Sequence, residues 1–202
     1  MVVAEIGCFD GSTTLDYADI ISRNDGTLYI VDWFKGASQA VDPSHVHRYN
    51  PDGSEELQKV FEENLKDYLD IIHILAGKSE DKIPEIPDDS LDICFIDADH
   101  SYKHVYQDIS LALPKVKKGG IICGHDFENI NLANHFSPEQ LADDDYPQLT
   151  PEQIQIQSPA STWPQEHVHA GSIQAVFDHF GYDVEHREDP FGHGIPIWVK
   201  PL

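Results

Sequence analysis

Residues 5–13 read EIGCFDGST and join a short apolar run to a pattern typical of a helix. Residues 1–6 predict a β-strand, and Ser12 is of a type that favours the N-cap of a helix. Gly7 permits a tight turn after the strand, and Gly11 permits close approach at the helix start. A strand, a glycine turn and a helix in this order commonly bind an anion or a nucleoside. The stretch therefore predicts an α/β fold with a ligand site at this turn, against the alternative of a purely structural turn.

An acidic residue follows the next predicted strand at the distance expected for a nucleoside site. Asp32 comes directly after the predicted strand 27–31 and lies 21 positions after Gly11. A carboxylate in this place commonly binds the hydroxyls of a ribose. The spacing G-x-x-x-G puts Phe9 where a dinucleotide-binding turn has its second glycine, and a side chain there would obstruct a pyrophosphate. We therefore expect a nucleoside ligand other than NAD or FAD, which disfavours an NAD-dependent oxidoreductase.

Strand-like and helix-like segments alternate along the next hundred residues. Further strands are predicted at 71–75, 91–96 and 121–123, and helices at 54–69 and 102–113. In the helix after Ser12, the residues expected on the buried face are Leu15, Ala18, Ile20 and Ile21. This alternation predicts a parallel sheet with helices on both faces.

The last third of the chain departs from this alternation. Residues 128–168 are polar and show no strong period, so we expect an insertion that acts as a lid or binding loop. A helix at 172–180 and two strands at 182–186 and 195–199, paired as an antiparallel hairpin, are predicted after it. We expect one domain, 1–202, that carries the insertion at about 128–168.

Composition excludes several classes of partner. The chain has 36 Asp and Glu against 13 Lys and Arg, a formal net charge of -23, which is unsuited to nucleic acid or to an anionic membrane. Cys8, Cys94 and Cys123 fall in or beside apolar runs, which is typical of reduced thiols in the cytoplasm. Neither a signal peptide nor an apolar run of membrane-spanning length is recognisable. A cytoplasmic protein is therefore expected.

Acidic residues also follow the fourth and fifth predicted strands. Asp97 comes directly after the strand 91–96, and Asp126 follows His125 after the fifth strand. Neighbouring strands lie about 5 Å apart, so two carboxylates at their ends would repel each other unless a cation lay between them. Oxygen ligands favour Mg²⁺, and a histidine ligand shifts the preference toward Mn²⁺. We predict a divalent cation on Asp97 and Asp126 with His125 as third ligand.

Five stretches together resemble the class I S-adenosylmethionine-dependent methyltransferases. They are EIGCFDGST, YIVDWF, LAGKSED, FIDADHSY and KKGGIICGHDF. The last two are most similar to small-molecule O-methyltransferases that act on catechols or macrolide sugars. The resemblance implies a Rossmann-like fold with a seven-stranded, mostly parallel sheet, an antiparallel last strand and helices on both faces. It implies S-adenosylmethionine as cofactor, bound by Glu5, Gly7, Cys8, Gly11, Ser12, Asp32, Trp33, Ser79 and Asp97.

The resemblance also implies a reaction and a set of catalytic roles. A methyl group would pass from S-adenosylmethionine to a hydroxyl of a small molecule, either a sugar or a catechol-like compound. Asp99 corresponds to the general base, and His100 competes for this role because its ordinary pKa is nearer neutrality. Alternatively, Asp99 stabilises the start of the next helix. His167-Val-His169 and His45-Val-His47 have metal-like spacing but no supporting acid nearby in the sequence, so we expect neither to bind metal.

Two departures from the family leave alternatives open. His125 and Asp126 stand where relatives have two acids or an acid and an amide, so the ligand set of this chain differs from the family's. The sequence begins directly at its first strand; either it is trimmed, or residues 36–53 or a second copy cover the cofactor, so a homo-oligomer is one alternative. A metal-independent N- or C-methyltransferase and a non-catalytic S-adenosylmethionine-binding protein are the competing functions.

Overall fold

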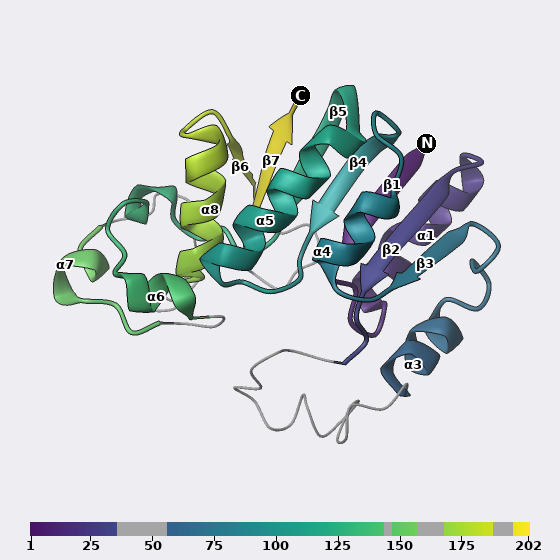
Figure 1. Cartoon of the computed structure of the whole chain (residues 1–202), viewed down its shortest axis with the longest axis horizontal. Helices are drawn as coiled ribbons and strands as arrows, with labels where there is room; N and C mark the ends of the chain where they lie inside the picture. Colours follow the sequence, from purple (N-terminus) through teal and green to yellow (C-terminus); the bar gives the residue numbers. More distant parts are fainter. Residues whose placement is uncertain (36–55, 144–146, 157–167, 188–195) are drawn as a thin grey trace.

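In the computed structural model, seven strands form one mixed sheet within the described residues, which are 1–35, 56–143, 147–156, 168–187 and 196–202 (Figure 1). The strand order is β3-β2-β1-β4-β5-β7-β6. The strands are β1 Val2–Ile6, β2 Thr27–Asp32, β3 Ile72–Ala76, β4 Leu91–Ile96, β5 Val116–Gly124, β6 Glu185–Arg187 and β7 Ile197–Pro201. Strands β1 to β5 pair in parallel, and β7 pairs antiparallel with both β5 and β6. The predicted mostly parallel sheet with an antiparallel last strand and a final hairpin is confirmed.

The carboxyl ends of the central strands meet at one edge of the sheet. Ile6 at the end of β1 pairs with Val31 of β2 on one side and with Ile96 of β4 on the other. Ile96 in turn pairs with Gly124 at the end of β5. The chain order reverses between β1 and β4, and ligands of open α/β sheets bind in the crevice outside such a reversal. The fold therefore brings the residues that follow these strands together at the carboxyl-end edge of the sheet.

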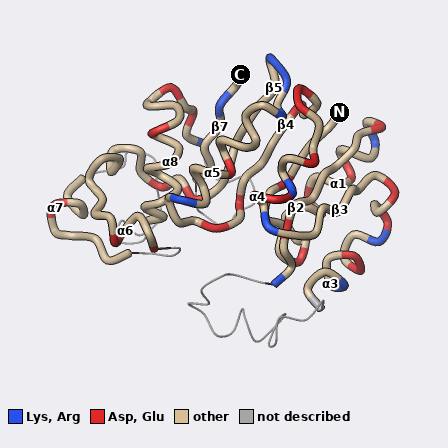
Figure 2. Tube along the Cα trace, viewed as in Figure 1, with Lys and Arg blue, Asp and Glu red and all other residues tan. Residues whose placement is uncertain are grey.

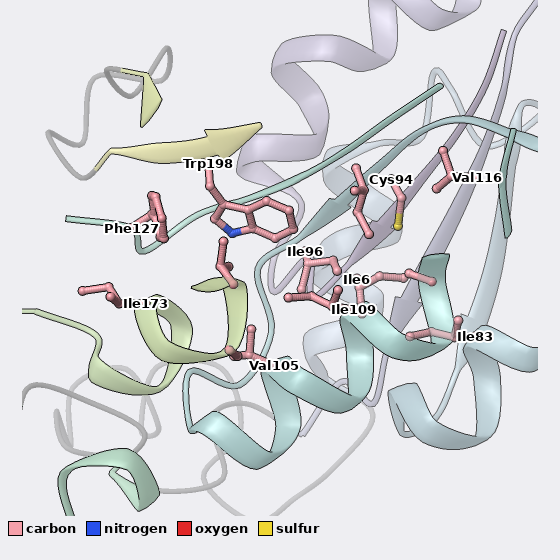
Figure 3. Packing of buried hydrophobic residues seen from close by; sticks show 14 of the residues in the cluster. Ile6, Ile83, Cys94, Ile96, Val105, Ile109, Val116, Phe127, Ile173 and Trp198 are labelled. Carbon is pink, nitrogen blue, oxygen red and sulfur yellow. The ribbon is translucent and has the colours of Figure 1, made fainter. Parts of the chain in front are cut away.

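Helices cover both faces of the sheet (Figure 1). They are α1 Ser12–Arg23, α3 Glu56–Asn64, α4 Ser79–Lys82, α5 Tyr102–Ala112, α6 Pro138–Ala142, α7 Pro151–Ile154 and α8 Ala170–Phe180, with short 3₁₀ turns at Ile83–Glu85, Leu113–Lys115 and Ile130–Leu132. On one face, Val105 and Ile109 of α5 and Ile173 of α8 belong to the same buried cluster as Ile6 and Ile96 (Figure 3). On the other face, α1 and α3 form a second cluster with β1 and β2.

The buried face of α1 is narrower than the sequence indicates. Ala18 and Ile21 are buried as predicted, but Leu15 and Ile20 are 43% and 57% exposed, so their predicted burial is wrong. The buried positions on α1 are 14, 18 and 21, which fall on one stripe of a 3.6-residue period, whereas 15 and 20 lie beside it. Ser12 is also not the N-cap: Gly11 occupies that position and Ser12 is the first helical residue.

Two element boundaries differ from the sequence prediction. β5 begins at Val116 instead of 121, because its start pairs with Leu91 of β4. α3 ends at Asn64 rather than 69. Its predicted start at 54, the predicted loop 36–53 and the His45-Val-His47 pair lie outside the described residues.

The insertion contains two short helices that its polar composition concealed. α6 and α7 begin within the similar stretches SPEQ (137–140) and TPEQ (150–153), and each starts with a capping box. The side chains of the two capping glutamines, Gln140 and Gln153, hydrogen-bond each other at 3.0 Å. The described part of the insertion is thus more regular than the loop that we expected.

The acidic excess is distributed over many elements. Asp and Glu recur along helices and connections on both sides of the fold, with few Lys and Arg among them (Figure 2). Within the described residues, no helix has the length and apolar character needed to cross a membrane.

Candidate active site at the carboxyl ends of the strands

The glycine turn after β1 lies directly against the end of β4. Gly7 has a φ of +85°, and its N–H donates to the Val31 carbonyl at 2.8 Å. A Cβ on Gly7 would lie 2.3 Å from the backbone oxygen of Asp97, closer than real Cβ atoms come. Only glycine therefore satisfies both the backbone conformation and this close approach. The predicted cofactor turn and the predicted metal ligand Asp97 are in this way brought together.

The Asp32 side chain accepts three backbone hydrogen bonds, two of them from the glycine turn. Its Oδ2 accepts from the N–H groups of Cys8 at 2.9 Å and Phe9 at 3.0 Å, and its Oδ1 accepts from Phe34 N–H at 2.6 Å. Phe9 has a φ of +50°, so the turn is held in a conformation that side chains rarely adopt. These bonds fix the Asp32 carboxylate beside the turn, where the sequence predicts the ribose hydroxyls.

Glu5 lies beneath the turn rather than on its surface. It is 1% exposed and accepts a 2.5 Å hydrogen bond from the Thr14 hydroxyl of α1. Burial raises the pKa of Glu5 to about 8, although the hydrogen bond from the Thr14 hydroxyl acts in the opposite direction. Its observed contacts connect β1 to α1, and its role toward the cofactor stays a prediction.

The other predicted cofactor residues are arranged around the same edge. Ser12 begins α1, and both its N–H and its hydroxyl donate to Asp10 Oδ1, at 3.0 and 2.6 Å. Trp33 is half-buried directly after β2, and Ser79 is half-buried at the first position of α4. Their positions follow the ends of β2 and β3, as the sequence predicts.

Asp97, His125 and Asp126 converge at the ends of β4 and β5. The Asp97 N–H donates to the Ile6 carbonyl at 2.8 Å, and the His125 N–H donates to the Ile96 carbonyl at 3.1 Å. One ligand atom from each of the three side chains lies within 4.8 Å of the other two. His125 Nδ1 is 3.0 Å from Asp126 Oδ1 and 3.8 Å from Asp97 Oδ1. This donor set of two carboxylates and one imidazole suits a divalent cation.

The two carboxyl groups are in opposite electrostatic situations. Burial and the neighbouring Asp126 raise the pKa of Asp97 to about 6. Burial also acts to raise the pKa of Asp126, but the imidazoles of His169 and His100 together hold it well below the ordinary value. Asp126 is therefore the permanent negative charge of the site, and a cation beside it would relieve its repulsion of Asp97.

Two further histidines contact Asp126, and one of them was missed by sequence reasoning. His100 Nε2 is 3.0 Å from Asp126 Oδ2, and His169 Nδ1 is 3.3 Å from Asp126 Oδ1. His169 also lies 2.6 Å from Glu128 Oε1. We expected no metal site at His169 because no acid is near it in the sequence, but the fold places Asp126 and Glu128 there. The expectation that it lacks a supporting acid is wrong, because α8 returns to the end of β5.

Asp99 is engaged at the start of α5. Its Oδ1 accepts from the Ser101 N–H at 2.9 Å and from the Ser101 hydroxyl at 2.5 Å, and it lies 3.0 Å from His104 Nδ1. These contacts match the alternative in which Asp99 stabilises the helix start. They also hold its carboxylate in one orientation, two residues after Asp97.

A buried acid lies behind the predicted adenine contact and gives a pH-dependent prediction. Asp108 of α5 is 1% exposed; burial raises its pKa to about 7, although a hydrogen bond from Ser79 lowers it. The stability that its protonated form provides is fully present below about pH 4 and is lost as pH rises through about 7. We expect Asp108→Asn to be more stable than the wild type at pH 8, and the difference to grow by about 2 kcal/mol between pH 5.5 and 8.

Urea denaturation at several pH values measures this difference. The exposed Asp70 gives the control variant Asp70→Asn, whose stability relative to the wild type should not change with pH in this window. A constant difference between wild type and Asp108→Asn across the window would contradict the buried titration.

Comparisons with known proteins agree with this fold. The model of a methyltransferase domain family matches residues 4–127, and no curated protein sequence matches the chain. Among solved structures, the O-methyltransferase NovP is similar over 99% of this chain and 72% of its own, with 19% identity and a TM-score of 0.57. The O-methyltransferase TomG from Streptomyces achromogenes, involved in tomaymycin synthesis and solved with S-adenosylmethionine, is similar over 100% and 73%, with 13% identity and a TM-score of 0.57.

A third similar structure is an O-methyltransferase from Bacillus cereus in complex with S-adenosylhomocysteine. It is similar over 100% of this chain and 74% of its own, with 15% identity and a TM-score of 0.55. At these identities the three structures establish the fold alone, and the family match rests on residues 4–127.

Proposed function

The chain belongs to the methyltransferase domain family and is an S-adenosylmethionine-dependent methyltransferase, and we propose that it methylates a hydroxyl of a small molecule with the help of a divalent cation. The observation that carries this proposal is the convergence of Asp97, His125 and Asp126 beside the glycine turn. A methyl donor held at the turn and a cation on these side chains would face the same acceptor.

The proposed donor site is the turn from Gly7 to Gly11 with Asp32. A helix N-terminus behind two glycines favours the charged amino-acid part of the donor, and Asp32 suits the ribose hydroxyls. The bonds from Cys8 and Phe9 hold the Asp32 carboxylate in place before any ligand arrives. Trp33 and Ser79 are the proposed neighbours of the adenine.

The proposed acceptor chemistry depends on the acids after β4 and β5. Asp97, His125 and Asp126 would hold the cation, which when bound lowers the pKa of an acceptor hydroxyl and orients it. Asp99 is the proposed base that accepts the hydroxyl proton, because Ser101 and His104 orient its carboxylate. His100 is the competing base, since its Nε2 lies against Asp126. The methyl group would then pass in line from the sulfonium to the acceptor oxygen, and S-adenosylhomocysteine would be the leaving group.

The insertion at about 128–168 is the proposed recognition element for the acceptor. Its first residue, Glu128, contacts His169 just beyond its last residue, so both ends of the insertion meet beside Asp126. A small molecule held between the two ends of the insertion would therefore lie close to the proposed cation. The similar structures NovP and TomG are O-methyltransferases, which supports a small hydroxyl-bearing acceptor such as a sugar or a catechol.

A turnover assay with a chelator tests this proposal. Purified protein is given S-adenosylmethionine and a panel of catechols and sugars, and formation of S-adenosylhomocysteine is measured with and without EDTA. We expect acceptor-dependent turnover that falls at least about 100-fold with EDTA and returns with Mg²⁺ or Mn²⁺. Turnover that EDTA leaves unchanged would point to the metal-independent reaction. Binding of S-adenosylhomocysteine without turnover on any acceptor would contradict the enzyme proposal.

A further inference from the structure

A second group of three potential ligands adjoins the first and shares Asp126 with it. His100 lies just before α5, Asp126 just after β5 and His169 just before α8. One ligand atom from each of these side chains lies within 4.8 Å of the other two. His100 approaches Asp126 Oδ2, whereas His125 and His169 both approach Asp126 Oδ1. One buried carboxylate thus belongs to two neighbouring groups, which we call the imidazole triad (His100, Asp126 and His169) and the oxygen-rich triad (Asp97, His125 and Asp126).

Close packing of two helix starts holds the imidazoles together. A Cβ on Gly171, in the first turn of α8, would lie 2.2 Å from the backbone oxygen of His100 and 2.2 Å from the Tyr102 nitrogen. Glycine at 171 therefore lets α8 touch the start of α5, and the two helices lie side by side in Figure 1. The rings of His100 and His169 meet edge to face with centroids 4.5 Å apart.

Glu128 orients His169 from behind. Glu128 is 2% exposed and His169 is 3% exposed. Glu128 Oε1 lies 2.6 Å from His169 Nδ1, and Oε2 accepts from the His169 backbone N–H at 3.1 Å. A metal-binding histidine usually donates its second ring N–H to a carboxylate, which fixes the tautomer and the ring orientation. His169 Nδ1 also lies 3.3 Å from Asp126 Oδ1, so an N–H on Nδ1 faces both carboxylates, and Nε2 carries the lone pair that a metal requires.

We infer that His100, Asp126 and His169 form a cation site of their own, selective for a first-row transition metal such as Zn²⁺, Co²⁺, Fe²⁺ or Mn²⁺ over Mg²⁺. Two imidazoles and one carboxylate suit these metals, whereas Mg²⁺ prefers oxygen ligands and water. Glu128 is a positioning residue for His169. The role of this metal in catalysis rests on the proposed function, but its binding does not. Assigning His100 to the metal leaves Asp99 as the base.

Cobalt binding tests this site independently of turnover. Co²⁺ is titrated into Asp97→Asn, which removes one ligand of the oxygen-rich triad, and binding is followed by calorimetry and visible absorption. We expect Asp97→Asn to bind Co²⁺, and Asp97→Asn/His169→Ala to bind it at least about 100-fold more weakly. Asp97→Asn/Glu128→Gln should bind Co²⁺ about 10- to 100-fold more weakly than Asp97→Asn. His73 is an exposed histidine of β3, so Asp97→Asn/His73→Ala is the matched control and should bind Co²⁺ with the same affinity as Asp97→Asn.

Two outcomes of the Co²⁺ titration would contradict the inferred metal site. One is loss of Co²⁺ binding in Asp97→Asn alone; the other is equal affinity in Asp97→Asn and Asp97→Asn/His169→Ala. If the His169 variant does not fold, X-ray absorption of the Zn²⁺-loaded wild type decides, because the imidazole triad supplies two imidazoles and the oxygen-rich triad one. A single imidazole, or none, would contradict the inference. Metal binding without methyl transfer would refute the proposed function and leave this site intact.

Discussion

Replacing Asp126 by asparagine is expected to lower kcat/KM for methyl transfer at least about 1000-fold, which corresponds to about 4 kcal/mol of transition-state stabilisation. Asp126 is the one residue that both ligand triads share, and it is 4% exposed. His169 and His100 hold its pKa well below the ordinary value, so it is charged at neutral pH. Asparagine keeps the shape and removes the charge. The proposed cation would then lose its strongest ligand.

Cofactor binding separates this effect from unfolding. Asp126 interacts with His100, His125 and His169, whereas Asp32 is bonded to the glycine turn. The affinity of Asp126→Asn for S-adenosylhomocysteine is therefore expected to stay within about threefold of the wild type. The exposed Asp70→Asn is the matched charge-removing control and should keep full turnover. If Asp126→Asn binds the cofactor product normally and still turns over within tenfold of the wild type, the catalytic role of Asp126 is wrong.

Gly7→Ala is expected to destabilise the protein by more than about 3 kcal/mol, and Gly119→Ala by only about 1–2 kcal/mol. The two glycines are matched in conformation, with φ values of +85° and +84°. A Cβ at 119 meets nothing within 4 Å, whereas a Cβ at 7 would lie 2.3 Å from the backbone oxygen of Asp97. The left-handed conformation costs both variants a similar amount. The difference therefore measures the contact between β1 and β4.

The collision at residue 7 involves backbone that cannot rotate away. Asp97 N–H is bonded to the Ile6 carbonyl, so the end of β4 can retreat only if this bond is lost. A loss of this size is a large part of the 5–15 kcal/mol that typically stabilises a domain. Urea denaturation of the two variants gives the comparison, with S-adenosylhomocysteine affinity as a second measurement. Equal destabilisation by Gly7→Ala and Gly119→Ala would contradict the close approach.

The sheet and its ligand edge could be predicted because their signals are local. Each of the first five strands contains a short, largely apolar run, and the residues after these runs include Gly7, Asp32, Asp97 and Asp126. Parallel pairing then requires these residues to share one edge. The antiparallel final hairpin followed from two short runs separated by a loop.

The imidazole triad could not be predicted because its partners are distant in sequence. Glu128 and His169 are 41 residues apart, and the intervening insertion has no hydrophobic period that would place its two ends together. Gly171 was an available signal, since a glycine inside a helix often marks a close approach, but its partner is not encoded nearby. The exposure of Leu15 and Ile20 has a similar cause, because helix periodicity does not say how wide the covering contact is.

A crystal structure of the protein with S-adenosylhomocysteine and Mn²⁺ tests most directly whether a methyl donor and a cation meet at Asp126. We expect the nucleoside to lie against the Gly7–Gly11 turn with its ribose at Asp32, and an anomalous manganese signal within bonding distance of an Asp126 oxygen. Nucleoside density at the turn without a manganese signal at Asp126 would contradict metal-assisted transfer at this edge of the sheet.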